Sequence, residues 1–248
     1  MQKDKRTGRK DVLITGRSMK VLFIGNSHTF FNDMPALFAR FAEMTMGEKT
    51  EAVMLAYGGR DYKWHRKEYF SVRYNLLYGG YDYCVLQQAA HPYPASEETL
   101  QYGKELIDIC HRTGTTPVIF ETWAEKRFPE NQQKMIDTCR KLAQDNDAVL
   151  APVGEIWQLI RERYPEIELY FRDGEHAGLY GDFLVAAVMC RTMAGDISED
   201  ASGIGIDFMG DIMPDFEMPV MTEDRDKLFI SLDREKTDRI LDIIREAF

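Results

Sequence analysis

Short apolar, β-branched runs alternate with longer amphipathic stretches along most of the chain. Five runs have the length and composition of buried strands: 20–24, 50–56, 81–86, 116–121 and 148–152. Apolar residues at helical spacing predict helices between and after them: 35–46, 62–79 (one helix or a pair), 96–112, 130–144, 155–162, 179–193 and a last helix within 233–248. Strands that alternate with helices favour parallel βαβ units. The pattern therefore predicts a three-layer α/β/α sandwich around a five-stranded, mainly parallel sheet.

The length of 248 residues fits one large α/β domain. Residues 1–18 are polar and basic, and we expect a tail there with a possible edge strand at 12–14. The domain is expected to span 19–248. Within it, the Gly-, Pro-, Met- and Asp-rich residues 196–232 are interpreted as a long covering loop with a possible last strand at 228–232, and 233–248 as the C-terminal helix.

Composition narrows the class of partner. The net charge of -10 argues against nucleic acid and anionic membranes, which both require a basic face. The sequence contains no run of 18 apolar residues and shows no apolar signal region, so we expect a soluble, cytoplasmic protein. The four cysteines are far apart and form no Cys-x-x-Cys motif, which favours reduced thiols and disfavours structural zinc.

The first predicted strand ends in a small-residue turn that carries Ser27. A parallel strand presents polar residues at its carboxyl edge, where open α/β sheets build their sites, so Ser27 is a candidate nucleophile; the alternative is a simple turn cap. A serine nucleophile requires a base. His176 is the best candidate because Asp173 lies three residues before it and can orient its ring. His28 is expected to point elsewhere, and His91, like the two remaining histidines, is interpreted as a surface or satisfied polar residue.

Acyl transfer also requires donors for the developing oxyanion. The backbone N–H groups of Ser27 and Gly59 are natural choices, and the side-chain amide of Gln87 or Gln88 could add a third; a tight turn and a solvated loop are the alternatives. Aromatic residues near the same edge could stack on a sugar ring or belong to the core or rim: Tyr57, Trp64, Tyr93 and Trp123.

Taken together, these segments resemble the SGNH (GDSL-like) hydrolase superfamily. Residues 25–29 (Gly-Asn-Ser-His-Thr) resemble its first block, 58–60 its second, and 173–176, followed by Gly178 and an apolar helix, its Asp-x-x-His block. The resemblance spans roughly residues 20–195. It implies a flavodoxin-like fold and metal-free hydrolysis of esters of acylated sugars, lipids and small alcohols. By the same resemblance Ser27 is the nucleophile, His176 the base, Asp173 its orienting acid, and Ser27 and Gly59 supply the oxyanion hole.

The third block departs from the family pattern. Where the family has Gly-x-Asn-Asp, this chain has Leu-Gln-Gln-Ala-Ala at 86–90. Some subgroups carry a glutamine at this strand end, so Gln87 is the expected third oxyanion donor and Gln88 a candidate substrate contact, along with Tyr57 and Trp123. An oxyanion donor lost without replacement costs about 3 kcal/mol of transition-state stabilisation.

The favoured function is a serine esterase that works through an acyl-enzyme and deacetylates a carbohydrate or small acylated molecule. No cofactor, metal, nucleic acid or membrane is expected to take part. The altered third block leaves open a catalytically weak module that binds an acylated ligand. A lipase- or thioesterase-like specificity is also open, if 196–226 form a Met-rich lid. The chain lacks Gly-x-Ser-x-Gly and the glycine-rich nucleotide motifs, which disfavours an α/β-hydrolase fold and nucleotide enzymes.

Overall fold

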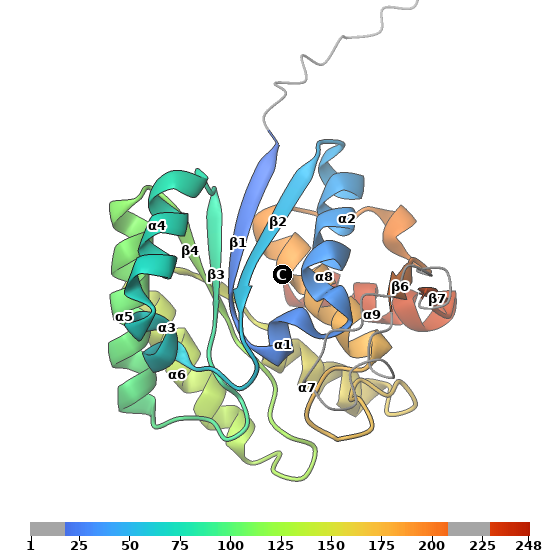
Figure 1. Cartoon of the computed structure of the whole chain (residues 1–248). Helices are drawn as coiled ribbons and strands as arrows, with labels where there is room; N and C mark the ends of the chain where they lie inside the picture. The colour runs from blue at the N-terminus through green and yellow to red at the C-terminus, as the bar shows by residue number, and fades with distance from the viewer. Residues whose placement is uncertain (1–17, 208–228) are drawn as a thin grey trace, which may run out of the picture.

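A five-stranded parallel sheet forms the centre of the chain in the order β2-β1-β3-β4-β5 (Figure 1). The computed structural model describes residues 18–207 and 229–248. The strands are β1 (Met19–Gly25), β2 (Thr50–Ala56), β3 (Tyr83–Gln87), β4 (Thr116–Phe120) and β5 (Val149–Ala151). Val21 of β1 is in register with Ala52 on one side and with Tyr83 on the other. The predicted three-layer α/β/α fold and all five of its strands are confirmed, with boundaries shifted by at most two residues.

The strand order decides where a site can form. The chain passes from β1 to β2 on one side of it and then returns to β3 on its other side. This reversal opens a crevice at the carboxyl ends of β1 and β3, the usual place for ligands in open α/β sheets. Ser27 follows β1 and Gln87 ends β3, so the predicted chemistry lies at this switch point.

Helices cover both faces of the sheet (Figure 1). One layer holds α3 (Tyr62–Lys67), α4 (Tyr69–Gly79), α5 (Ser96–Arg112) and α6 (Asn131–Asp145). The other holds α2 (Met34–Met46), α7 (Val153–Arg163), α8 (Leu179–Met193) and α9 (Arg234–Ala247). All the predicted helices are present, 62–79 as a pair. The short α1 (Ser27–Phe30) and the 3-10 helix η1 (Phe31–Asp33) occupy what the sequence suggested was a turn.

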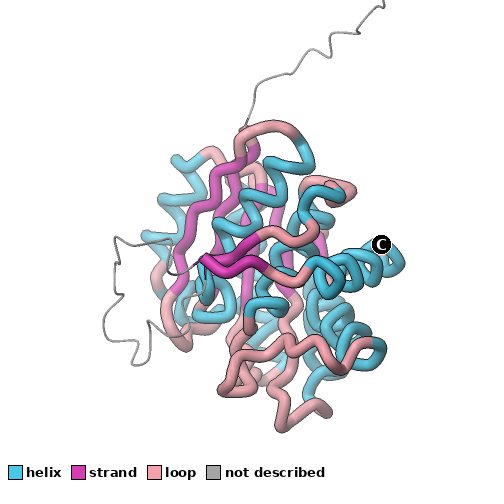
Figure 2. The backbone as a smooth tube through the Cα atoms, turned by 90° about the vertical axis from the view of Figure 1, so that its right-hand side faces the viewer, coloured by secondary structure: helices cyan, strands magenta, loops and turns pink. Residues whose placement is uncertain are grey.

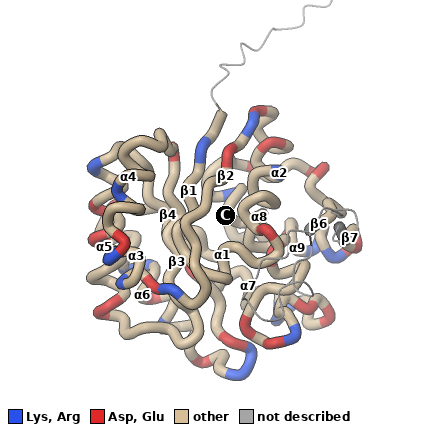
Figure 3. The backbone as a smooth tube through the Cα atoms, in the orientation of Figure 1, with Lys and Arg blue, Asp and Glu red and all other residues tan. Residues whose placement is uncertain are grey.

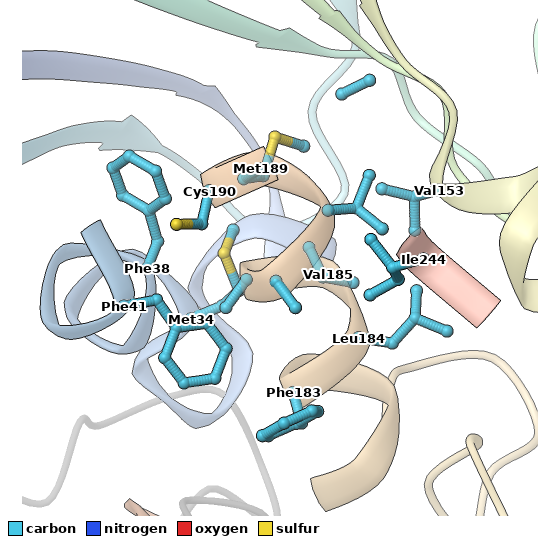
Figure 4. Packing of buried hydrophobic residues seen from close by; sticks show 14 of the residues in the cluster. Met34, Phe38, Phe41, Val153, Phe183, Leu184, Val185, Met189, Cys190 and Ile244 are labelled. Carbon is cyan, nitrogen blue, oxygen red and sulfur yellow. The ribbon is translucent and has the colours of Figure 1, made fainter. Parts of the chain in front are cut away.

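Helix α8 forms the centre of its layer. Residues 183–190 are all fully buried, as expected for a helix that is apolar on every side. Figure 4 shows α8 with Phe38 and Phe41 of α2 on one side and Ile244 of α9 on the other. The rings of Phe41 and Phe183 meet edge to face at 5.1 Å. This packing fixes the chain immediately after the predicted Asp-x-x-His block.

The expected covering loop contains regular structure at both ends. A 3-10 helix η2 (Glu199–Ala201) and strand β6 (Gly205–Asp207) precede the undescribed part, and β7 (Phe229–Ser231) follows it. The predicted last strand is therefore present, but it pairs antiparallel with β6 and not with the main sheet. Figure 2 shows this ribbon on the side of the molecule that carries α8 and α9. The expected tail at 1–17 and the centre of the expected loop, 208–228, lie outside the described residues.

Charged residues gather on the peripheral helices and loops, with both signs interspersed (Figure 3). All four cysteines are buried and free of disulfides. Across 18–207 and 229–248, none of the helices combines the length and apolarity that crossing a membrane would demand.

Candidate active site

A cavity of about 340 Å³ opens at the carboxyl edge of the sheet, at the switch point between β1 and β3. Its walls come from four separate segments of the chain. Three of them follow β1, β2 and β3, and the fourth is the loop that contains Glu175 and His176. The lining residues are Asn26, Ser27, His28, Gly58, Gly59, Ala89, Ala90, His91, Glu175 and His176. The cavity thus joins the three segments on which the family resemblance rests.

Ser27, His176 and Asp173 form a continuous hydrogen-bonded chain in this cavity wall. The Ser27 Oγ lies 2.7 Å from Nε2 of His176, and Nδ1 of the same ring lies 2.7 Å from Oδ2 of Asp173. An ionised carboxylate only accepts hydrogen bonds, so the Nδ1 proton is directed at Asp173 and Nε2 is left to accept the serine proton. This arrangement can deprotonate a serine as it attacks an acyl carbon.

Local hydrogen bonds keep Asp173 ionised. Its partial burial would raise the pKa of this carboxyl group, but three donors oppose the effect: the N–H of Glu175, the His176 ring and the N–H of His176. Together they lower the pKa below its usual value. The negative charge opposite the imidazole is therefore retained at neutral pH.

The position of Ser27 follows from a tight junction between β1 and α1. Asn26 caps α1, and its side-chain oxygen accepts the N–H of His28 at 3.0 Å. A Cβ on Gly25 would lie 2.4 Å from the Thr29 hydroxyl oxygen, so only glycine fits there. Ser27 is thus held at the first position of a helix, where backbone N–H groups are free of intrahelical partners.

The Gly59 loop is tied directly to this junction. Asn26 Nδ2 donates to the Arg60 carbonyl at 2.9 Å, and Gly59 has the left-handed φ of 67° that favours glycine. Gly59 and Ser27 line the same cavity. The structure thus brings together both residues that were expected to offer backbone oxyanion donors.

Gln87 does not face the cavity, which corrects the expectation that it supplies the third donor. Its side chain is fully buried under the β1–α1 junction. The Oε1 atom accepts the N–H of Asn26 at 2.8 Å and the Thr29 hydroxyl at 3.0 Å, and Nε2 donates to the Gln88 carbonyl. Gln87 therefore holds the nucleophile turn in place, a role that strand-end position alone could not reveal.

Gln88 is likewise buried, and its side-chain amide is taken up by internal hydrogen bonds. This corrects the expectation that Gln88 contacts the substrate. Its Oε1 accepts the N–H groups of Tyr62 and Ala89, each at 2.9 Å, and its Nε2 donates to Thr99 at 3.0 Å. The neutral amide links the loop after β3 to α3 and α5.

The three aromatic candidates nearest the edge have different surroundings. Trp123 is fully buried, which corrects its assignment as a substrate contact; it stacks on Trp157 at 4.1 Å and donates from Nε1 to the Glu175 carbonyl at 2.8 Å. Tyr57 is 47% exposed, directly precedes the cavity residue Gly58 and packs against Trp64 at 4.9 Å. Tyr57 and Trp64 therefore remain available at the rim.

Two histidines that the sequence analysis set aside lie in the cavity wall. The ring of His28 lies 5.0 Å from that of His176 and 4.8 Å from that of His91. Burial lowers the pKa of His28 well below its usual value, with the charges of His91 and His176 adding to the effect. Burial also lowers the pKa of His91 to about 4, against the opposing carboxylate of Glu125. Sequence gave no signal for their direction: His28 directly follows Ser27 and was expected to point away from it, and His91 lies in a loop outside every motif.

A buried amide–carboxyl pair joins the nucleophile segment to the His176 segment. Asn32 Nδ2 donates to Oδ2 of Asp182 at 2.5 Å and to the Ala177 carbonyl at 3.4 Å. Burial raises the pKa of Asp182 well above its usual value. The pair connects η1 to the residue after His176 and to the first turn of α8.

A search of residues 18–207 and 229–248 finds no group of three or more His, Cys, Asp or Glu side chains arranged to hold a metal ion.

No family model and no curated protein matches the sequence, but solved structures match the fold. A Slackia heliotrinireducens protein described as an SGNH hydrolase is 25% identical, with a TM-score of 0.62 over 71% of this chain and 100% of that one. The lipase/acylhydrolase of Enterococcus faecalis is 15% identical, with a TM-score of 0.56 over 73% and 97%. A catalytic mutant of an acetylxylan esterase from Geobacillus stearothermophilus is 10% identical, with a TM-score of 0.59 over 72% and 96%. The chain thus has the fold of the SGNH hydrolases, and three of its segments resemble the sequence blocks of that superfamily.

Proposed function

We propose that this protein is a serine hydrolase that cleaves carboxylic esters through an acyl-enzyme. The observation that carries the proposal is the hydrogen-bonded chain from Ser27 Oγ through His176 to Asp173, with both links at 2.7 Å. The chain opens into a cavity that also contains Gly59. The pieces needed for acyl transfer are thus within reach of one bound ester group.

In the first half of the proposed reaction, Ser27 Oγ attacks the ester carbonyl carbon while Nε2 of His176 takes the hydroxyl proton. The carbonyl oxygen becomes an oxyanion that the N–H groups of Ser27 and Gly59 stabilise. When the carbon–oxygen bond to the alcohol breaks, His176 returns its proton to the departing alkoxide. In the second half, His176 takes a proton from a water molecule as the water oxygen attacks the acyl carbon. The bond between that carbon and Ser27 Oγ then breaks, the carboxylic acid leaves, and His176 returns the proton to Ser27 Oγ.

Among the described residues that line the cavity, Asn26 carries the one side-chain amide, and its Nδ2 and Oδ1 atoms are already bonded to the Arg60 carbonyl and the His28 N–H, so it does not take the role that the third block fills in the family. We propose that a rigid backbone compensates for the missing donor. Gln87 and Asn26 hold the turns that carry the Ser27 and Gly59 N–H groups through the hydrogen bonds described above. Preorganised backbone donors require no reorganisation as charge develops.

The substrate that we propose is an acetylated carbohydrate or small acylated molecule. Acetylxylan esterases occur among the proteins with this fold. The exposed ring of Tyr57, backed by the half-buried Trp64 whose own ring lies under the Arg60 guanidinium at 5.3 Å, offers an aromatic face of the kind that stacks on sugars.

The proposal is tested by hydrolysis of p-nitrophenyl esters from acetate to octanoate, with wild type, Ser27→Ala and His176→Ala. We expect the highest kcat/KM for acetate and a loss of at least about 10³-fold in each variant, because members of a triad act as one unit. Labelling of wild type, but not of Ser27→Ala, by a fluorophosphonate identifies the nucleophile independently of the substrate.

Two other results would redirect the assignment. A maximum at long acyl chains would favour the lipase- or thioesterase-like specificity. Equal rates for wild type and Ser27→Ala with every ester, together with no fluorophosphonate labelling, would contradict the proposed hydrolase and favour a module that only binds acylated ligands.

A further inference from the structure

The two cavity histidines that the proposed mechanism does not use carry unpaired polar atoms. His28 and His91 both line the Ser27 cavity, with ring centroids 4.8 Å apart. Both ring nitrogens of His28 and Nε2 of His91 are buried, and none has a hydrogen bond of ordinary geometry among residues 18–207 and 229–248. The backbone of Glu175 approaches both rings outside these limits, and its carbonyl already accepts the Trp123 indole N–H at 2.8 Å. A buried polar atom without a partner lowers stability, so three of them gathered in one cavity wall indicate a place where a ligand supplies the missing bonds.

The charges around this wall disfavour an anionic ligand. Glu175 is the one charged side chain among the described residues that line the cavity, and its carboxylate lies 3.3 Å from Arg127. Glu125 lies 3.5 Å from Nδ1 of His91 and 2.5 Å from Nε of the same arginine. The nearby cation is therefore already shared by two carboxylates.

The imidazoles themselves suit a hydroxyl group. Both rings are neutral at pH 7, because burial disfavours their charged forms. A neutral imidazole offers one donor and one acceptor, which matches a hydroxyl group that donates one hydrogen bond and accepts another. The nitrogens are covered in the unliganded chain, so binding involves a turn of the His91 ring about its Cβ–Cγ bond toward the cavity that it lines.

We propose that His28 and His91 form a subsite for a hydroxyl group on the alcohol portion of the substrate, which makes the protein selective for neutral, hydroxyl-bearing esters over plain alkyl esters. The inference rests on the proposed function. We assign the alcohol side because the His28 ring stacks on His176 at 5.0 Å, and in the proposed mechanism His176 delivers its proton to the departing alkoxide. A hydroxyl one or two carbons from that oxygen is therefore the group that the proposal assigns to the His28–His91 subsite.

Two acetates that differ by one group provide the test. 2-Hydroxyethyl acetate and propyl acetate have almost the same shape, with a hydroxyl in one where the other has a methyl group. After division by their alkaline hydrolysis rates, we expect wild type to favour the hydroxyl ester by about tenfold in kcat/KM, the effect of one uncharged hydrogen bond. His91→Phe and His28→Phe should each abolish most of this preference, and His91→Gln, which keeps a donor and an acceptor, should retain part of it.

The matched control is His111→Asn. His111 is an exposed histidine of α5 that contacts the Asn146 carbonyl at 2.9 Å, and its replacement should leave the preference intact. The subsite is overturned if wild type shows no preference, if the preference survives in both phenylalanine variants, or if it occurs only for a hydroxyl on the acyl side, tested with propyl glycolate against propyl propionate.

Failure of the proposed function gives a different result. In that case wild type hydrolyses neither acetate faster than Ser27→Ala, and the subsite is tested by binding alone. Imidazole ¹⁵N shifts of the wild-type protein are then followed during titration with 1-O-acetylglycerol. Shifts at His28 and His91 but not at His111 would support the subsite, and unchanged shifts at both would overturn it.

Discussion

At the scale of single residues, Trp123 and Trp157 have nearly the same packing but different hydrogen bonding. Their indole rings lie parallel at 4.1 Å, and both are buried. Trp123 Nε1 donates to the Glu175 carbonyl, whereas Trp157 Nε1 makes no hydrogen bond of ordinary geometry among the described residues and approaches only the side chain of Tyr170, away from the His176 loop backbone. Glu175 lies directly before His176, so only Trp123 is positioned to hold the orientation of the proposed base.

Replacement of either tryptophan by phenylalanine separates this positioning role from packing. Both variants lose similar volume, and each should lower the free energy of unfolding by roughly 1–3 kcal/mol. Trp123→Phe should also lower kcat for p-nitrophenyl acetate about tenfold relative to Trp157→Phe, with KM almost unchanged, because a hydrogen bond that positions the base is lost. Steady-state kinetics and urea denaturation test this. Equal kcat values in the two variants would contradict it.

Glu121 contributes a pH dependence of stability. This carboxyl group is fully buried after β4, and burial together with the neighbouring Glu155 raises its pKa from 4.5 to about 8. Between these values the unfolded chain releases a proton that the folded chain keeps. Rising pH therefore favours the unfolded state across this window, by on the order of 5 kcal/mol in total.

Glu121→Gln should remove most of this dependence. The amide keeps the oxygen that accepts the Glu155 N–H at 2.9 Å and does not ionise. We expect the variant to be more stable than wild type at pH 8 and similar to it near pH 4.5. Urea unfolding at the two pH values measures the effect. A variant whose stability falls as steeply with pH as that of wild type would rule out Glu121 as the source.

At the scale of elements, the β1–α1 junction depends on close approach of the backbone to buried side chains. A Cβ on Gly25 would lie 2.4 Å from Thr29 Oγ1 and 2.5 Å from Gln87 Oε1, the atoms that hold the turn. At Gly58 a Cβ would have no neighbour within 4 Å, and its φ is not in the left-handed region. The two glycines therefore tolerate substitution very differently.

Gly25→Ala should lower the free energy of unfolding by about 1–3 kcal/mol, the usual cost of overpacking, and should also lower kcat because Ser27 moves with the turn. Gly58→Ala should change stability by less than about 0.5 kcal/mol. Thermal or urea unfolding of the pair is the measurement. Similar losses of stability at both positions would show that the junction relaxes freely.

The elements themselves were largely predictable from apolar spacing, and the site only in part. Strands end where apolar runs end, and the pairing of Asp173 with His176 follows from their separation in one loop. The directions of Gln87 and Trp123 could not be predicted, because a strand-end position does not say whether a side chain faces the cavity or the interior. The inward position of His28 depends on α1, a four-residue helix with no apolar period to reveal it.

At the scale of the whole molecule, one helical layer is completed by the end of the chain. Helix α9 presents Ile240, Leu241, Ile243 and Ile244 to the core that surrounds α8 (Figure 4). Helix α2 packs on the other side of α8. The core around α8 therefore joins a helix from the first part of the described sequence to the last helix. Stability should therefore depend on the C-terminal helix.

Ile244→Ala should lower the free energy of unfolding by roughly 2–5 kcal/mol, as expected for truncation of a fully buried isoleucine. Ile230→Ala, at a position that is 37% exposed, should cost much less. Chemical denaturation of both variants gives the comparison. Losses of equal size would mean that α9 contributes little to the cooperative core.

The proposed nucleophile and its proposed base are separated by 149 residues, and the Asn32–Asp182 pair ties their segments together across a similar separation in sequence. A ribosome therefore completes Ser27 long before the imidazole that activates it emerges. Until the α8 segment docks, the serine is an ordinary alcohol and cannot acylate itself on cellular esters. Acquisition of fluorophosphonate reactivity would thus report the moment at which a newly made chain becomes fully folded.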